Sequence, residues 1–472
     1  MLTGSLSGQS ESYDPDRIFS VVELKQDLEV LQKHLEAIHP GLFNYMSVER
    51  WKEILEEKRN RIDSPMTELD FYKIIGNLLE SIGDVHTDIE PSDAYYRSLN
   101  QVMKVFPLSV KWFNDHLYVI HNFSDDRSIN PGDRLMRING NSADSIYRII
   151  RSYVPRDGFN LTSPDYVLGG IWGGYRNLYS ILFGNPDVYE LELEGSREEI
   201  FKTKIKAKTY PQLFAQYQGL PKQKEKLSID IRDKIAIMQV RSFHPGAIRD
   251  GGQNFRRFFK RAFVKIDKKG IENLVLDLRN NGGGHQSVFL ELASFLLDTP
   301  FQVYDRLYTI TDSIPNHAYY LERDQLKNME TEIRKNAKRE GALFCLQGEE
   351  GTTPVTPKEP NFDGKLFILV DGSCSSATGD FTGLMKNQHA ATFVGDEVGG
   401  NPVTNCAGTT LTLVLPNSRI QAYIPTTRYD LKVDLPNNGH GIIPDILIKP
   451  TIEQYISGED PVLEKIDQID FR

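Results

Sequence analysis

The sequence is poor in cysteine and has no long apolar run. Its three cysteines form neither a metal-spaced pair nor a disulfide framework, so free thiols are favoured over a single bridge; they are Cys345, Cys374 and Cys406. No segment approaches the roughly 18 uninterrupted apolar residues of a membrane-spanning helix, and we expect no membrane span. Residues 1–20 are polar and lack the basic and apolar regions of a secretory signal. Either the protein stays inside the cell or a signal was removed from it.

A block of basic residues is also missing. The chain has 55 Lys and Arg against 65 Asp and Glu, which gives a net charge of −10. We therefore expect neither nucleic acid nor an anionic membrane surface as the partner. The zinc motif HExxH does not occur, and the glycine-rich segments lack the lysine of a phosphate-binding loop. We expect no metal and no other cofactor.

Hydrophobic periodicity divides the 472 residues into several domains. Apolar residues at helical spacing predict that residues 1–98 form an N-terminal helical domain. Alternating strands follow in residues 99–210, where a Pro-Gly turn, a short strand and an Asn-Gly turn succeed one another between Ile129 and Gly140. This segment resembles the centre of a PDZ domain, and the structural alternative is a generic strand between two turns. Residues 150–185 have the composition of an insertion into this domain.

The rest of the chain is predicted to consist of a linker and one α/β domain. We expect the linker at residues 211–226 and the domain at residues 227–472. Strands and helices alternate along the domain, which predicts a mostly parallel sheet covered by helices. A charged helix near residues 321–340 is expected to lie on the surface.

Two apolar strands of this domain end in loops of small residues. The strand at residues 274–278 leads to the glycines of residues 282–284, and the strand at residues 366–370 leads to a serine-rich turn that includes Ser376. Chemistry in open α/β sheets collects beyond the carboxyl ends of strands, so the two loops predict an oxyanion hole and a serine nucleophile. The structural alternative for any of these serines is capping of the helix that follows.

Motifs in the right order resemble those of the S41 peptidases, the tail-specific (C-terminal processing) and tricorn-like serine proteases. They are residues 277–283 (DLRxNxGG), 370–379 with 394–400 (the nucleophile segment), 439–446 (GxGVxPDI), and the His39-Pro40 and 84–87 elements. The resemblance covers nearly the whole chain. It implies a multidomain α/β and α+β protein, in which a crotonase/ClpP-like α/β catalytic domain follows an N-terminal helical domain and a PDZ-like domain.

The resemblance also implies a nucleophile and an oxyanion hole. Ser376-Ala377-Thr378 matches the family's S-A-S/T element, which identifies Ser376 as the nucleophile with Ser375 as the fallback. The backbone N–H groups of Gly282 or Gly283 and of Ala377 would hold the oxyanion.

The general base departs from the family pattern. Asn401 stands where tail-specific proteases have a lysine, and Gln239 occupies the region of the tricorn-type histidine. We choose His86 as the base, oriented by Asp84 or Asp88, against the alternative of a structural loop histidine. Other residues that could line the site or replace these groups are His285, His440, Lys386 and Asn401. Glu397 or Asp396 could supply an orienting carboxylate, with a solvated loop as the alternative.

The sequence thus predicts a serine endopeptidase of S41 type that hydrolyses unfolded or C-terminally presented polypeptides. The alternative is a catalytically inactive protein of the same fold that binds peptides or apolar ligands, and a weaker one is an acyl-thioester enzyme. The expected partners are polypeptide substrates, which the PDZ-like domain would hold by strand addition or admit to the site. The resemblance favours a periplasmic or secreted protein, and a homo-oligomer is one means of restricting access.

Overall fold

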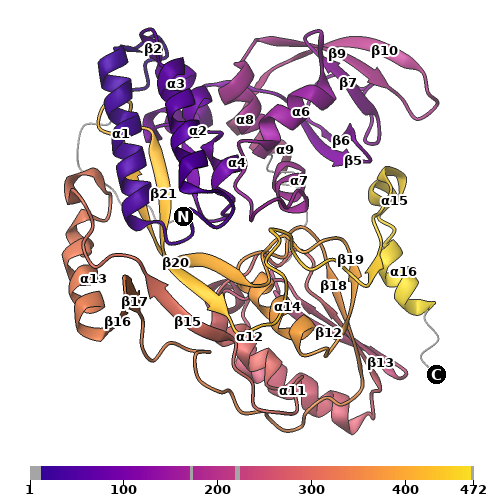
Figure 1. The fold of residues 1–472 in the computed structure, drawn as a ribbon. Helices are drawn as coiled ribbons and strands as arrows, with labels where there is room; N and C mark the ends of the chain where they lie inside the picture. The colour runs from indigo at the N-terminus through magenta and orange to yellow at the C-terminus, as the bar shows by residue number, and fades with distance from the viewer. Residues whose placement is uncertain (1–11, 171–173, 218–223, 469–472) are drawn as a thin grey trace.

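The computed structural model describes residues 12–170, 174–217 and 224–468 (Figure 1). It begins with the helices α1 (Val21–Ile38), α2 (Val48–Arg61), α3 (Glu68–Ile75), α4 (Leu78–Ile82) and α5 (Asp93–Gln101), and with the paired short strands β1 (Ile18–Phe19) and β2 (Met66–Thr67). A capping box of Ser20 and Glu23 starts α1, whose apolar stripe is buried. No helix in the described ranges is long and apolar enough to cross a membrane.

An antiparallel sheet of order β10-β9-β7-β6-β5 follows the helices. Its strands are β5 (Leu108–Phe113), β6 (His116–Asn122), β7 (Arg134–Ile138), β8 (Asn141–Ser142), β9 (Val188–Glu194) and β10 (Ile200–Lys206). The helices α6 (Ala143–Arg151), α7 (Thr162–Leu168) and α8 (Gly174–Phe183) contribute to the same core. The short strands β4 (Lys104–Val105) and β11 (Lys208–Thr209) pair with each other. Turns at Gly132 and Gly140, both with positive φ, flank β7 as the pattern predicts.

The C-terminal region is built on a mostly parallel sheet of order β12-β13-β14-β18-β19-β22. The strands are β12 (Leu227–Arg232), β13 (Ile235–Val240), β14 (Asn273–Asp277), β18 (Lys365–Val370), β19 (Thr392–Gly395) and β22 (Ile446–Leu447); only the β12–β13 pair is antiparallel. Side chains alternate between two cores. One core includes α11 (Phe255–Lys268), α12 (Gln286–Ala293) and α14 (Ala377–Asn387), and the other includes residues of α16 (Pro461–Asp467).

A long hairpin ties the N-terminal helices to this region (Figure 1). It consists of β20 (Thr404–Val414) and β21 (Gln421–Leu431), with β15 (Tyr304–Thr309), β17 (Leu343–Cys345) and β16 (Lys338–Glu340) extending the sheet beyond β21. The strand β3 (Asp88–Glu90), from the N-terminal part of the chain, pairs with β21. Leu411, Leu413 and Ile424 of the hairpin lie in the same hydrophobic core as the buried face of α1. This contact brings the segment before β3 toward the C-terminal sheet.

The structure differs from the expected linker at residues 211–226 and agrees with the expected charged helix near residues 321–340. Residues 211–226 were expected to be a linker, but Tyr210–Tyr217 forms helix α9, because Leu213 is fully buried in the N-terminal core. Residues 218–223 lie outside the described part of the chain. The charged helix is α13 (Arg323–Asn336), which buries Leu326 and Ile333 and exposes most of its charges. The remaining short helices are α10 (Pro245–Asp250), η1 (His317–Tyr319) and α15 (Ile452–Ser457).

Candidate active site

Ser376 lies at the sharp turn between β18 and α14. Its backbone has φ of 53° and ψ of −130°, a strained conformation for a residue with a side chain. The Ser376 side chain makes no capping hydrogen bond to α14, so the capping alternative does not describe this serine. A Cβ added to Gly283 would lie 2.9 Å from the Ser376 Cβ, which shows how closely the glycine loop approaches the turn. The serine hydroxyl is thus held by tight backbone packing at a helix N-terminus.

His86 reaches Ser376 from the N-terminal region. Its Nε2 atom lies 3.1 Å from the Ser376 Oγ, which is hydrogen-bond distance. Gly83, in the left-handed conformation, ends α4 and turns the chain toward this position. The His86 backbone N–H donates to Oδ1 of Asp84 at 3.0 Å, and the same oxygen lies 3.8 Å from His86 Nδ1. A serine, a histidine and a carboxylate therefore converge from two distant parts of the sequence.

Asp84 is buried and held in its ionised form. Burial raises its pKa, but the hydrogen bond and charge of His39, together with His86, lower the pKa below its usual value. The Oδ2 atom accepts hydrogen bonds from His39 Nε2 and from the Thr87 hydroxyl, both at 2.8 Å. The His39 Nδ1 accepts the Gly41 N–H at 3.0 Å, which fixes the ring with its proton on Nε2. The His39-Pro40 element thus supports the carboxylate beside His86.

His86 is held in its neutral form. Burial lowers the pKa of its imidazole, and the Asp84 charge and the Cys406 backbone oppose this effect without reversing it. The Nδ1 atom is buried and has no partner at hydrogen-bond distance among the described residues. The ring keeps about a quarter of its side-chain surface exposed. A neutral imidazole with Nε2 directed at a serine is the form that can accept a proton.

The glycine loop lies against the Ser376 turn. Gly284 has φ of 145° and passes so close to Phe243 that a side chain at this position would clash with the backbone. The Gly283 N–H already donates to Oδ1 of Asn281 at 3.0 Å, and Ser375 Oγ donates to the Gly282 carbonyl at 3.4 Å. The N–H groups of Gly282 and Ala377 make no hydrogen bond within the described part of the chain. These two donors remain open toward a ligand.

Asp157 is a buried group that the sequence patterns did not single out. Its Oδ1 accepts the Val85 N–H at 3.0 Å, and its Oδ2 accepts the Asn401 N–H at 2.9 Å. Gly158 N–H donates to the Gly83 carbonyl at 3.0 Å, which adds a second bond to the His86 segment. Burial and the neighbouring Asp84 charge raise the pKa of Asp157 to about 7. Asp157 therefore joins the segment carrying His86 to the loop that packs beside Ser376.

Several predicted alternatives are engaged elsewhere. His285 caps α12 by accepting the Ser287 N–H, and Asn401 accepts the N–H groups of Val403 and Thr404. Lys386 pairs with Asp445, and Asp396 pairs with Lys449. Glu397 accepts hydrogen bonds from Asn160 and Gly441, and His440 Nδ1 lies 3.1 Å from it. Asp88 lies on β3, and burial together with Glu90 raises its pKa. None of these residues has a hydrogen bond to His86 in the described structure.

The Asp277-Leu278-Arg279 segment supports the glycine loop through ion pairs. Asp277 is fully buried and accepts hydrogen bonds from Arg279 and Arg241, which lower its pKa despite burial. Arg279 also pairs with Asp460 ahead of α16. Asp277 and Arg279 thus form a structural ion pair, which stabilises the start of the glycine loop.

Metal and disulfide chemistry find little support at the site. All three cysteines are free and buried. His39, Asp84 and Cys406 bring potential ligand atoms within 4.8 Å of one another. Both ring nitrogens of His39 are already used in hydrogen bonds, so this group is better explained as support for Asp84.

Comparisons with known proteins relate part of the chain to a family. Residues 234–448 match the sequence model of "Peptidase family S41". Two strains of Staphylococcus epidermidis contain a "Probable CtpA-like serine protease" that is 27% identical over 144 residues, or 30% of this chain. The match spans 22% of the length of those relatives.

Solved structures share the fold at low sequence identity. Mature CPAF is 12% identical with a TM-score of 0.63, covering 95% of this chain and 97% of CPAF. Its complex with lactacystin gives 13% identity, the same TM-score and the same coverage. These structures support a mixed α/β fold of the S41 protease type. The match of residues 234–448 to peptidase family S41 agrees with the predicted serine-type peptidase.

Proposed function

We propose that this protein is a serine endopeptidase in which Ser376 is the nucleophile and His86 the general base. The observation that carries the proposal is the 3.1 Å contact between His86 Nε2 and Ser376 Oγ across the two halves of the chain. An isolated serine is a weak nucleophile and needs an adjacent base. The chain assembles such a base although the lysine and histidine positions of the family hold Asn401 and Gln239.

The proposed reaction begins with attack of Ser376 Oγ on the peptide carbonyl carbon. His86 Nε2 takes the hydroxyl proton as the new C–O bond forms, and the carbonyl oxygen becomes an oxyanion. The tetrahedral intermediate collapses when Nε2 gives this proton to the leaving amine and the C–N bond breaks. Water then attacks the acyl-serine with the same assistance, releasing the acid and restoring Ser376.

The oxyanion is proposed to accept hydrogen bonds from the N–H groups of Gly282 and Ala377. Both are open in the structure, whereas the Gly283 N–H is engaged with Asn281. Ala377 is the first residue of α14, so the helix dipole adds to its donor strength. We assign Gly283 the role of allowing the loop to approach Ser376, because any side chain there would meet the turn.

Asp84 is proposed to stabilise the imidazolium that forms during attack. Its charge lies 3.8 Å from Nδ1, where it favours the protonated ring without a direct hydrogen bond in the resting structure. Since Asp84 stays ionised, it supplies this charge throughout the working pH range. Asp88 is not needed for this role.

Residues 99–210 are proposed to form a PDZ-like domain that positions the base rather than capturing peptide on β5. Arg176 of α8 donates to Ser109 at 2.9 Å and to the Leu108 carbonyl at 3.4 Å, both on this outer strand. The insertion therefore occupies the neighbourhood of β5, while Asp157 from the same region holds the His86 segment. We infer that unfolded polypeptides, rather than tagged carboxyl termini alone, are the substrates.

The test is cleavage of an unfolded protein and a mixed peptide pool, followed by mass spectrometry. Wild type should cut both, while Ser376→Ala and His86→Ala should each lose at least ~100-fold. Ser375→Ala and His285→Ala are matched controls that should retain activity. If wild type cuts nothing while it binds peptides, the inactive-protein alternative replaces the proposal.

A further inference from the structure

A basic surface follows α11, although the protein as a whole is acidic. The helix has the sequence FRRFFKRAFVKIDK, with one acidic residue against its cations Arg256, Arg257, Lys260, Arg261, Lys265 and Lys268. The cations do not form a continuous block, because they are interleaved with buried apolar residues. Arg257, Arg261 and Lys265 are exposed and form no ion pair within the described residues. Such a face favours an anionic partner.

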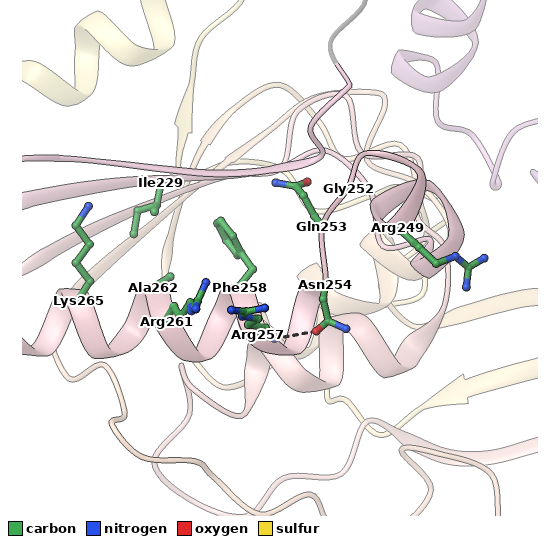
Figure 2. Close-up of a pocket in the computed structure, with 10 residues that line it drawn as sticks. All are labelled: Ile229, Arg249, Gly252, Gln253, Asn254, Arg257, Phe258, Arg261, Ala262 and Lys265. Atoms are coloured by element: carbon green, nitrogen blue, oxygen red, sulfur yellow. Dashed lines mark hydrogen bonds between the residues drawn. The ribbon is translucent and has the colours of Figure 1, made fainter.

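These cations border a cleft of about 680 Å³ between α11 and β12, here named the α11–β12 groove (Figure 2). It is lined by Ile229, Arg249, Gly252, Gln253, Asn254, Arg257, Phe258, Arg261, Ala262 and Lys265. Figure 2 shows Ile229 of the strand facing Phe258 and Lys265 of the helix across the gap. The groove thus has an apolar floor and four cationic side chains, with no acidic residue in its lining.

The strand beside the groove offers free backbone groups. β12 is the outer strand of the sheet and pairs only with β13 in the described structure. The side-chain amide of Gln253 accepts from the Leu227 N–H at 3.0 Å and donates to the Leu227 carbonyl at 2.6 Å. Backbone groups alternate between the two edges of a strand, so those of Ile229 and Ile231 point to the same outer edge as those of Leu227. Gln253 therefore occupies the place of a neighbouring peptide group, and no strand among the described residues pairs with the edge beyond it.

We propose that the α11–β12 groove binds an extended acidic polypeptide segment, which adds as a strand to β12. Main-chain hydrogen bonds to Ile229 and Ile231 would set its path, and Arg257, Arg261 and Lys265 would select acidic side chains on one face. The strands β13 and β14 separate β12 from β18, the strand that leads to Ser376. The groove is therefore a second peptide-binding site outside the proposed catalytic centre and does not depend on the proposed function.

Other occupants fit the groove less well. A second copy pairing through the same face would bring two sets of cations together, which is unfavourable. Nucleic acid would use the cations, but it has no use for an open strand edge with an apolar floor. An extended acidic polypeptide uses the cations and the backbone edge together.

The test measures binding by fluorescence anisotropy with the full chain carrying Ser376→Ala, so that the probe stays intact. The probe is a labelled peptide of about ten residues that alternates Glu and Val. We expect saturable binding that weakens roughly 10-fold or more in Arg257→Glu/Arg261→Glu and also weakens with added salt. The matched control, Lys52→Glu/Lys327→Glu, makes the same charge change on α2 and α13 and should bind like the parent; both of its lysines are exposed.

Three further probes separate strand addition from simple charge attraction. A peptide of equal charge with Pro in place of alternate Val should bind at least ~10-fold more weakly, because proline removes backbone donors. A Lys-Val peptide should not bind. Equal binding of the proline peptide, or tighter binding of a single-stranded oligonucleotide with the same dependence on Arg257 and Arg261, would overturn the proposal. Circular dichroism of each variant confirms that a loss of binding does not reflect unfolding.

Discussion

The nucleophile and base candidates lie 3.1 Å apart but belong to regions that are built differently. Ser376 lies in the turn that follows β18, a strand with a parallel neighbour on each side, and the turn packs tightly against the glycine loops of the same sheet. His86 lies in a loop whose position depends on Asp157, on the pairing of β3 with β21, and on the hydrophobic contact of the hairpin with α1. The position of the serine is a local property of the sheet, whereas that of the histidine is a property of the assembled chain.

The largest effect on activity is expected from substitution of Ser376. Ser376→Ala should reduce kcat/KM for peptide cleavage by about 10⁴-fold or more. Its free energy of unfolding should stay within about 0.5 kcal/mol of wild type, because the serine caps no helix. Peptide cleavage and urea unfolding measure the two quantities. If Ser375→Ala loses this much activity and Ser376→Ala keeps full activity, the nucleophile is Ser375 and not Ser376.

The base is expected to give a smaller loss with a pH signature. His86→Ala should lower kcat/KM by about 10²–10⁴-fold. Because the pKa of His86 is lowered, wild-type activity should fall only when the pH drops below the usual histidine pKa of about 6.5, where Nε2 becomes protonated. The residual activity of the variant should lack this acid limb. A full pH–rate profile in His86→Ala identical in shape to wild type would assign the limb to another group.

Asp157 joins the His86 segment to the loop beside Ser376, and its substitution should reduce activity less than the substitution of His86. Asp157→Asn replaces one accepting oxygen with an NH₂ group, which cannot accept the Val85 or Asn401 N–H. We expect kcat/KM to fall by roughly 10-fold, because misplacement of the base weakens the contact with Ser376. The matched control is Asp133→Asn, another buried Asp that accepts the Asn130 N–H far from the site in sequence. It should lower stability without this loss of activity.

The last prediction concerns stability rather than activity, as a difference that depends on pH. The pKa of Asp157 is raised from 3.8 to about 7, so the folded state retains its proton where the unfolded state has released it. Its contribution to stability is therefore fully present below about pH 4 and is lost as the pH rises through 7. Relative to Asp157→Asn, wild type should lose about 1.4 kcal/mol per pH unit inside this window. Urea unfolding at a series of pH values measures the slope, and parallel curves would contradict the assigned pKa.

Sequence patterns were sufficient where structure is local. The strands that lead to the glycine loop and to Ser376 appear as short apolar runs, and the order of strands and helices predicted the parallel sheet. Helices α1, α2 and α11 follow from apolar spacing and caps. The family motifs then singled out Ser376 and the glycine loop.

Contacts between residues far apart in the chain were harder to predict from the sequence. The hairpin β20–β21 carries a period-two pattern around the turn near Asn417, which could have been identified as a pair of strands, but its contact with α1 could not. Asp157 gives no signal, because its two backbone donors come from residues 72 and 244 positions away. Leu213 shows the same limit, since its burial in a core formed by distant segments has no signal in the residues around it.

The central claim is that His86, from the N-terminal region, activates Ser376. Covalent labelling with a fluorophosphonate, which reacts with activated serines, tests this claim most directly. Intact-mass and peptide mass spectrometry should show one adduct, on Ser376, in wild type and in Ser375→Ala. The labelling rate should fall by at least ~100-fold in His86→Ala and less in Asp157→Asn. Labelling of Ser376 at the wild-type rate in folded His86→Ala, or no adduct in wild type, would contradict the account.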